Sequence, residues 1–113
     1  MEIRVLRDSY GIYILELRGN LNLYSSNRIK ELVMRLIELK VEKFILDLKN
    51  VNIINSAGIG VLVYISSTMQ KLNLTLAITN VRGVVQAAMH VTRLSRLLPI
   101  IPTLKEAVET IRA

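Results

Sequence analysis

A serine followed by two glycines, at Ser56, Gly58 and Gly60, is the part of this chain whose residue types and spacing could support chemistry. The apolar run 44–48 before it is typical of a buried strand. Apolar residues then recur at spacings of three and four, which predicts a helix to about Leu72. The serine therefore lies where the first unpaired N–H groups of a helix point outward. That position suits either an N-cap hydroxyl or a phosphate carrier, and the residues alone leave both roles open.

Other catalytic arrangements are missing from the sequence. The 113 residues include no cysteine and one histidine, His90, and they contain neither an HExxH nor a phosphate-loop pattern. The glycine pair lacks the third glycine of a dinucleotide-binding loop. No carboxylate lies near Ser56 in the sequence to orient a catalytic base. We therefore predict a protein that is not an enzyme, with no catalytic residues, no metal site and no cofactor.

The charge distribution points to an anionic partner for the half of the chain that carries Ser56. The net charge is +6, and no acidic residue occurs between Asp47 and Glu106. This half should present a positive field that suits an acidic protein, a phosphate or an anionic ligand, unless the cations are only scattered solubilising charges. The basic residues neither cluster on one predicted helix nor alternate with aromatic residues, so nucleic-acid binding is the weaker interpretation.

The composition favours a cytoplasmic protein that does not insert into membranes. The longest apolar run near Ser56 is Ile59 to Ile65, far below the roughly 20 residues that a membrane span needs. The chain opens directly into a strand pattern, with no signal peptide in view. A chain of this length has room for one continuous core.

The hydrophobic periodicity predicts the element order ββαβαβαβα. Strands are expected over about 2–7, 12–17, 43–49, 74–79 and 97–101, and helices over about 25–37, 56–72, 83–92 and from 103 onward. Gly19 should end the second strand, and Ser25 or Ser26 should cap the first helix. Pro99 places the last strand at a sheet edge, and Thr103 with Glu106 has the pattern of a capping box.

Strand–helix alternation from the third strand onward predicts parallel neighbours with right-handed crossovers. We therefore expect one α/β domain over residues 1–113. Its mixed sheet should have four to five strands packed with about four helices.

Three segments resemble STAS domains of the anti-sigma factor antagonist type. The sequence Asn55-Ser56-Ala57-Gly58-Ile59-Gly60 is similar to their D-S-[ST]-G-[LI]-G signature. The stretch 18–22 is similar to an earlier G-x-[LI]-D element, and the segments 89–94 and 103–108 are similar to the last helical part of these domains. The likeness covers nearly the whole chain in the same order.

The resemblance implies a partner-switching function. A protein of this family binds an anti-sigma factor that is also a serine kinase, and thereby frees a sigma factor for transcription. The kinase phosphorylates the motif serine, here Ser56, and the complex dissociates until a serine phosphatase resets it. On this basis the expected partner-binding residues surround Ser56 and extend into the helix after it: Asn22, Asn55, Ser56, Ala57, Gly58, Ile59 and Val63.

Two departures from the family pattern leave an alternative open. Asn22 and Asn55 stand where the family has aspartate, and Ala57 stands where it has a hydroxyl. Asparagine can keep the loop geometry, but it lacks the charge that a kinase or phosphatase could recognise. The alternative is a STAS module that binds a ligand or assembles a stress-sensing or lipid-transport complex without phospho-switching. The oligomeric state is not specified by the sequence.

Overall fold

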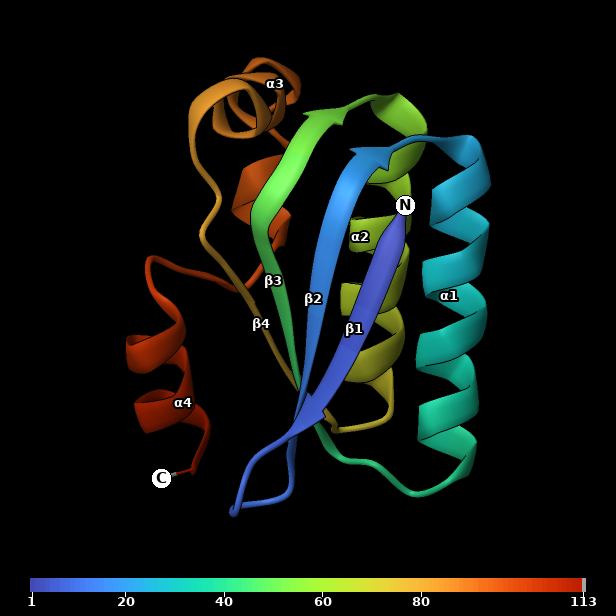
Figure 1. Cartoon of the computed structure of the whole chain (residues 1–113), viewed down its shortest axis with the longest axis vertical. Coiled ribbons are helices and arrows are strands. Elements are labelled where there is room, and N and C mark those ends of the chain that lie inside the picture. The colour runs from blue at the N-terminus through green and yellow to red at the C-terminus, as the bar shows by residue number, and fades with distance from the viewer. Residues whose placement is uncertain (113) are drawn as a thin grey trace.

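Five strands form one mixed sheet in the order β1-β2-β3-β4-β5 (Figure 1). The computed structural model describes residues 1–112. β1 is antiparallel to β2, and the remaining neighbours are parallel. The strands are β1 (Glu2–Arg7), β2 (Ile12–Leu21), β3 (Lys43–Ile54), β4 (Thr75–Thr79) and β5 (Ile100–Ile101). The predicted α/β class and the order ββαβαβαβα are confirmed.

Helices cover both faces of the sheet and one of its ends. They are α1 (Leu23–Glu38), α2 (Ser56–Lys71), α3 (Gly83–Thr92) and α4 (Leu104–Arg112), with a short 3₁₀ helix η1 (Leu94–Leu97). α1 and α2 pack on one face, α4 lies on the other, and α3 lies across the end where β3 finishes (Figure 1). No helix of the described part of the chain is long and apolar enough to cross a bilayer.

Alternate residues of the central strands supply two cores, because successive side chains of a strand point to opposite faces. In β3, Phe44 and Leu46 belong to the larger core under α1 and α2, whereas Ile45 belongs to the smaller core under α4. Asp47 is the buried acid of the same strand. Its Oδ1 accepts hydrogen bonds from the Lys49 backbone N–H at 3.0 Å and from Asn80 Nδ2 at 2.9 Å.

The central strands run further than the sequence predicts. Gly19 does not end β2, because this glycine adopts φ +118° and the chain continues to Leu21, with register shifts in its pairing to β3 on either side. β3 likewise continues past Lys49 to Ile54. Pairing between β2 and β3 keeps both segments extended beyond the residues at which their local sequence predicts the strands to end. As a result, Leu21 and Ile54 finish opposite each other at one end of the sheet.

The last part of the chain follows the sequence prediction closely. β5 is an edge strand directly after Pro99, as expected. The Thr103 Oγ1 accepts a hydrogen bond from the Glu106 backbone N–H at 3.1 Å, which is one of the two hydrogen bonds of the predicted capping box. The extended segment expected from Leu97 is shorter, because residues 94–97 form η1.

Candidate functional site

Two helices begin side by side at the end of the sheet where β2 and β3 finish. Leu21 and Ile54 pair in parallel register, and each is followed by one asparagine and then by a helix. The Asn55 backbone N–H donates to the Leu21 carbonyl oxygen at 3.2 Å, which joins the two junctions. The segments 18–22 and 55–60 that the sequence singled out are therefore brought together at one end of the sheet.

Asn22 caps α1, in place of the predicted Ser25 or Ser26. Its Oδ1 accepts from the Ser25 backbone N–H at 3.1 Å, and the Ser25 Oγ accepts from the Asn22 backbone N–H at 2.9 Å. This is a reciprocal capping box in which the serine sits three residues inside the helix. Ser25 and Ser26 are both buried. Sequence reasoning chose the serines because it placed a loop over residues that the structure assigns to β2 and α1.

Asn55, and not Ser56, is the N-cap of α2. Its Oδ1 accepts from the Gly58 backbone N–H at 3.1 Å, and its backbone is extended, as an N-cap requires. Ser56 is the first residue of the helix and is exposed. Because Asn55 already satisfies the capping role, the Ser56 hydroxyl is left free for modification or contact.

The two glycines of the motif have different surroundings. A Cβ added at Gly58 would lie 2.5 Å from the Leu21 carbonyl oxygen and 2.9 Å from Ile54 Cγ1, whereas one added at Gly60 would meet nothing within 4 Å. Gly58 is therefore required for the close approach of α2 to the strand ends. Gly60 lies one turn after Ser56 on the same side of the helix and is exposed, which leaves room for a partner to approach the backbone.

Large exposed apolar side chains lie on the elements that meet at this end of the sheet, and sequence reasoning missed most of them. Leu23 and Tyr24 in the first turn of α1 are 66% and 75% exposed, and Ile53 at the tip of β3 is 56% exposed. Tyr64, two turns after Ser56, is half exposed, and Lys30 Nζ of α1 lies 4.2 Å from the centre of its ring. We call this surface the Ser56 face; it comprises Asn22, Leu23, Tyr24, Ile53, Asn55, Ser56, Gly60 and Tyr64.

Three of the residues expected to bind a partner are turned inward or shared with the core. The side chain of Ile59 is 2% exposed and lies in the larger core, and Gly58 is buried, so neither offers a side chain to a partner. Val63 is half-buried and packs against the same core. A Val63→Asp substitution would therefore replace a core contact with a carboxylate, so it would not test partner binding alone. Ala57 is half-buried, while Asn22, Asn55 and Ser56 are exposed.

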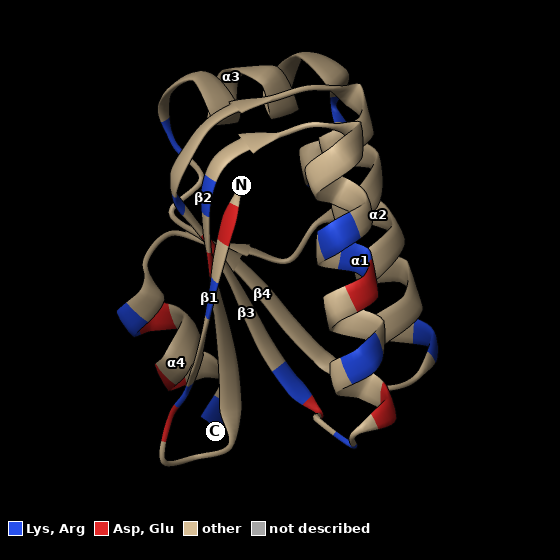
Figure 2. Cartoon of the chain, turned by 45° about the vertical axis from the view of Figure 1, so that its right-hand side comes forward, with Lys and Arg blue, Asp and Glu red and all other residues tan. Residues whose placement is uncertain are grey.

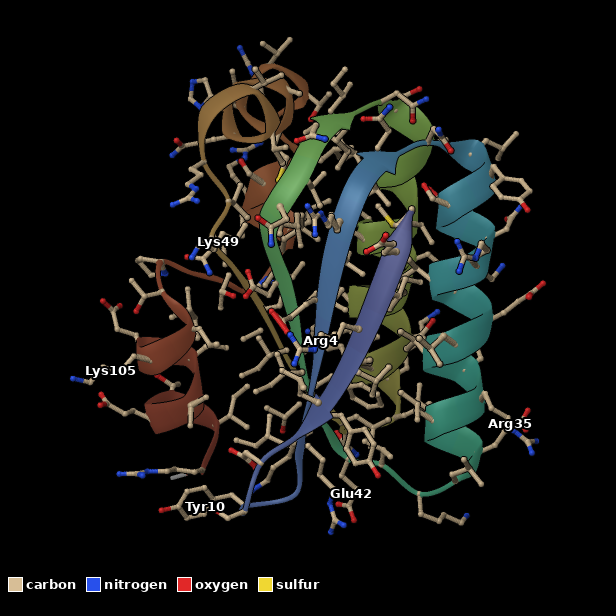
Figure 3. All side chains as sticks on the ribbon, in the orientation of Figure 1. Arg4, Tyr10, Arg35, Glu42, Lys49 and Lys105 are labelled. Carbon is tan, nitrogen blue, oxygen red and sulfur yellow. The ribbon has the colours of Figure 1, made fainter. Side chains whose placement is uncertain are left out.

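The helix N-termini at this end of the molecule favour an anion. The first turns of α1, α2 and α3 contain no acidic residue, so the partial positive charges of their N-termini are not offset there. In the ribbon of Figure 2 the starts of these helices carry no Asp or Glu colour, and Figure 3 labels Glu42 and Tyr10 at the opposite end of the molecule. An anionic group at Ser56 would therefore be stabilised by its surroundings.

The cap of α2 leads to a stability prediction. Asn55→Ala should lower the free energy of unfolding by about 1 kcal/mol, because the Gly58 N–H loses its acceptor. Asn55→Asp should retain the cap, because its carboxylate accepts the same hydrogen bond and faces the positive helix end. Chemical denaturation measures both changes.

The control for this prediction is Asn52→Ala, which removes an exposed asparagine from the same strand end. Equal losses for Asn52→Ala and Asn55→Ala would contradict the assigned cap.

Among residues 1–112 there is no group of three or more His, Cys, Asp and Glu side chains arranged to hold a metal ion. The site therefore consists of a hydroxyl, two amide caps, backbone N–H groups and apolar side chains. These groups can accept a modification and bind a protein surface.

Comparisons with known proteins agree on one family. The STAS domain family model matches residues 4–107. A putative anti-sigma factor antagonist from Thermotoga maritima has a similar structure, with a TM-score of 0.88 and 24% identity over 98% of this chain and 95% of the other. SpoIIAA, the Bacillus cell fate determinant, was solved in unphosphorylated and phosphorylated forms. The unphosphorylated form has a TM-score of 0.82 and 15% identity, and the match covers 98% of this chain and 96% of the other.

A membrane protein also contains a similar domain. The murine anion transporter Solute Carrier 26 family member A9 aligns with a TM-score of 0.72 and 21% identity over 90% of this chain, which spans 18% of the transporter. The fold is thus shared by anti-sigma factor antagonists and by a part of an anion transporter.

Proposed function

The chain belongs to the STAS domain family, and from this membership and the free Ser56 hydroxyl we propose that it is an anti-sigma factor antagonist that acts by partner switching. With Ser56 unmodified, the Ser56 face binds an anti-sigma factor that has serine kinase activity. Phosphorylation of Ser56 releases this partner, and a serine phosphatase restores the binding form. The observation that carries the proposal is an exposed serine, relieved of capping by Asn55, among exposed apolar side chains.

A phosphate at Ser56 should change binding far more than it changes the fold. It adds about −1.5 to −2 charges to the first turn of α2, where the helix N-terminus offsets part of that charge by roughly 0.3–1 kcal/mol. A docked partner would instead bury the phosphate against Leu23, Tyr24 and Ile53, which supply no cation to pair with it. Burying an unpaired dianion costs several kcal/mol, so the complex dissociates.

Asn22 and Asn55 keep the geometry of such a switch. Each retains the cap that an aspartate would form, through hydrogen bonds of 3.1 Å to Ser25 and Gly58. Their neutral side chains also remove two repulsive charges from the neighbourhood of a phosphate on Ser56. This supports phosphorylation at Ser56 in a chain that lacks the acids of the family pattern.

The experiment that tests the proposal compares two baits, Ser56→Ala and Ser56→Asp, in a pull-down from lysate of the native host. An ATPase with a protein-kinase activity toward serine should be recovered by the alanine form and not by the aspartate form. Recovery of the same proteins on both baits would contradict partner switching.

A second prediction concerns the apolar part of the Ser56 face. Ile53→Asp should weaken binding of the recovered partner by at least tenfold, because it introduces a charge into the contact, and it should leave thermal unfolding unchanged because Ile53 is exposed. The matched control is Leu72→Asp. Leu72 is 53% exposed and follows the far end of α2, about 24 Å from Ser56 along the helix. Equal weakening by both variants would place the contact elsewhere.

A second candidate function is a ligand-binding or assembly module that does not switch. It is favoured by the missing acids at positions 22 and 55 and by the similar domain of the anion transporter. A lipid or nucleotide retained by the purified protein in native mass spectrometry would support this candidate. Loss of partner binding in Ser56→Asp would oppose it.

A further inference from the structure

The sheet has one edge that is open to another strand. β1 and β5 are the two edge strands. β5 is only two residues long and is flanked by Pro99 and Pro102, which lack the N–H group that pairing needs. β1 has six residues with no proline, pairs with β2 on one side only, and leaves Val5 42% exposed. An edge strand of this length presents a row of unpaired N–H and C=O groups that can pair with a further strand.

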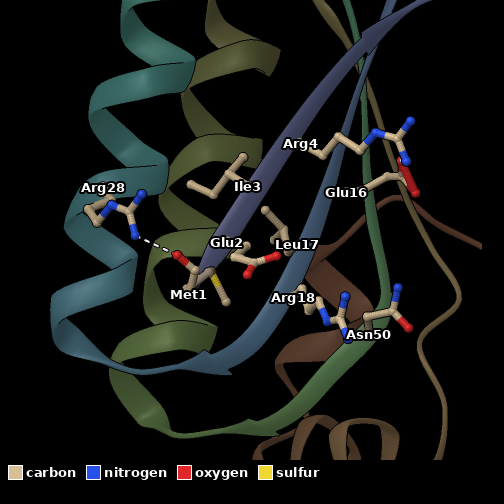
Figure 4. Close-up of a pocket in the computed structure, with 9 residues that line it drawn as sticks. All are labelled: Met1, Glu2, Ile3, Arg4, Glu16, Leu17, Arg18, Arg28 and Asn50. Carbon is tan, nitrogen blue, oxygen red and sulfur yellow. Dashed lines mark hydrogen bonds and ion pairs between the residues drawn. The ribbon is translucent and has the colours of Figure 1, made fainter.

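Charges alternate in sign across β1 and β2. Glu2 lies opposite Arg18 and Arg4 lies opposite Glu16 on the face turned away from α1 and α2, where Arg4 Nη1 and Glu16 Oε1 are 3.9 Å apart (Figure 4). The side chain of Arg4 is 76% exposed, so it is available to a further acid. An open groove of about 580 Å³ runs along this part of β1, lined by residues of β1 and β2 together with Arg28 and Asn50.

We propose that the occupant of this edge is a second copy of the chain, with the two β1 strands antiparallel and paired around Ile3. In this register Ile3 lies opposite Ile3 of the second copy, and Glu2 lies opposite Arg4 of the second copy, twice by symmetry. The charges then alternate without interruption over four strands, from Arg18 through Glu2 to Arg4 and Glu16 of the second copy. Opposite charges placed directly across an antiparallel pair stabilise it.

Charge also selects this register among the symmetric ones. Directly opposed residues of an antiparallel pair point to the same face, so a two-fold axis must pass through a pair of identical residues. Pairing around Arg4 would oppose two arginines, and pairing around Val5 would set Arg4 against Leu6. Only the register around Ile3 matches each acid with a base. On the opposite face it sets Val5 against Met1 of the second copy.

A hydrogen bond from α1 holds the residue that precedes β1. Arg28 Nη1 of α1 donates to the Met1 carbonyl oxygen at 2.6 Å, which holds the first residue in line with the strand (Figure 4). Because the two β1 strands are antiparallel, the two Ser56 faces point to opposite ends of the dimer. The dimer therefore leaves both faces accessible, and this inference does not rest on the proposed function.

The absence of native cysteine allows the register to be read directly. Ile3→Cys places two thiols on directly opposed residues, whose Cα atoms lie about 4.5–5.5 Å apart in an antiparallel pair and can form a disulfide. Val5→Cys is the matched control. Each Val5 is four residues from its equivalent across the pair, roughly 14 Å, too far for a bridge. Mild oxidation should give a covalent dimer with Ile3→Cys and monomer with Val5→Cys.

The association itself is measured by sedimentation velocity over a concentration series. The wild type should form a dimer that Glu2→Arg abolishes, because arginines would then oppose each other twice across the pair. Glu109→Arg changes the net charge equally on an exposed turn of α4 and should leave the dimer intact. A wild type that stays monomeric throughout, a dimer that survives Glu2→Arg, or cross-linking of Val5→Cys or Arg4→Cys as readily as Ile3→Cys would overturn the proposal.

Discussion

Ser56→Asp should weaken binding of the anti-sigma factor partner about a thousandfold, while Ser56→Ala should bind as well as the wild type. The exposed hydroxyl is the first residue of α2, and the neighbouring residues of the Ser56 face offer apolar surface and neutral amides. A charge buried there without a counter-ion costs several kcal/mol, and about 4 kcal/mol corresponds to a thousandfold loss of affinity. Titration calorimetry with the recovered partner measures both variants.

The stability of the same variants separates a binding effect from a folding effect. An aspartate at the N-terminus of α2 interacts favourably with the helix dipole, so Ser56→Asp should unfold at the same denaturant concentration as the wild type or at a slightly higher one. A Ser56→Asp protein that is fully folded and keeps the wild-type affinity would remove Ser56 from the contact.

Gly58→Ala should lower the free energy of unfolding by about 3 kcal/mol. The new Cβ would lie 2.5 Å from the Leu21 carbonyl oxygen, which also accepts the Asn55 N–H, so relief of the clash must move the junction of β2, β3 and α2. Overpacking of this kind typically costs 1–3 kcal/mol, and here the obstructing atom belongs to the backbone.

Gly60→Ala is the matched control, because it adds the same methyl group one half-turn further along α2. That methyl group meets no atom within 4 Å, and alanine has a higher helix propensity than glycine. The free energy of unfolding of this variant should therefore rise by about 0.5–1 kcal/mol. Urea denaturation of the two variants should give shifts of opposite sign. Equal destabilisation would mean that both glycines are needed for their backbone conformation and not for space.

Much of the architecture could be predicted from hydrophobic periodicity. The alternation of apolar runs with period-three and period-four stripes predicts the order of elements, and the parallel pairing follows from the strand–helix alternation. The boundaries at Gly19 and Lys49 could not be predicted. Each strand is extended by pairing with its neighbour, and that pairing depends on residues far away in the sequence.

The sequence predicted where the candidate site lies, but it did not predict which residue caps α2 or which side chains are exposed there. The motif around Ser56 lies at the start of α2, but the serine is not the cap, because the preceding Asn55 already fills that role. A helix that is apolar on all sides gives no sequence signal to tell the buried Ile59 from an exposed contact residue. Leu23 and Ile53 join the site only because Leu21 and Ile54 end in register. The apolar residue directly after the Asn22 cap was the signal that could have pointed to Leu23.

The central claim is that Ser56 is the phosphate acceptor that controls partner binding, and one reaction tests it directly. The purified wild type is incubated with the recovered kinase partner and Mg-ATP, and intact mass, phosphosite mapping and complex formation are followed together. We expect one phosphate per chain, located on Ser56, with dissociation of the complex at the same rate, and neither event with Ser56→Ala. Phosphorylation at another residue, or a complex that persists after Ser56 is phosphorylated, would contradict the account.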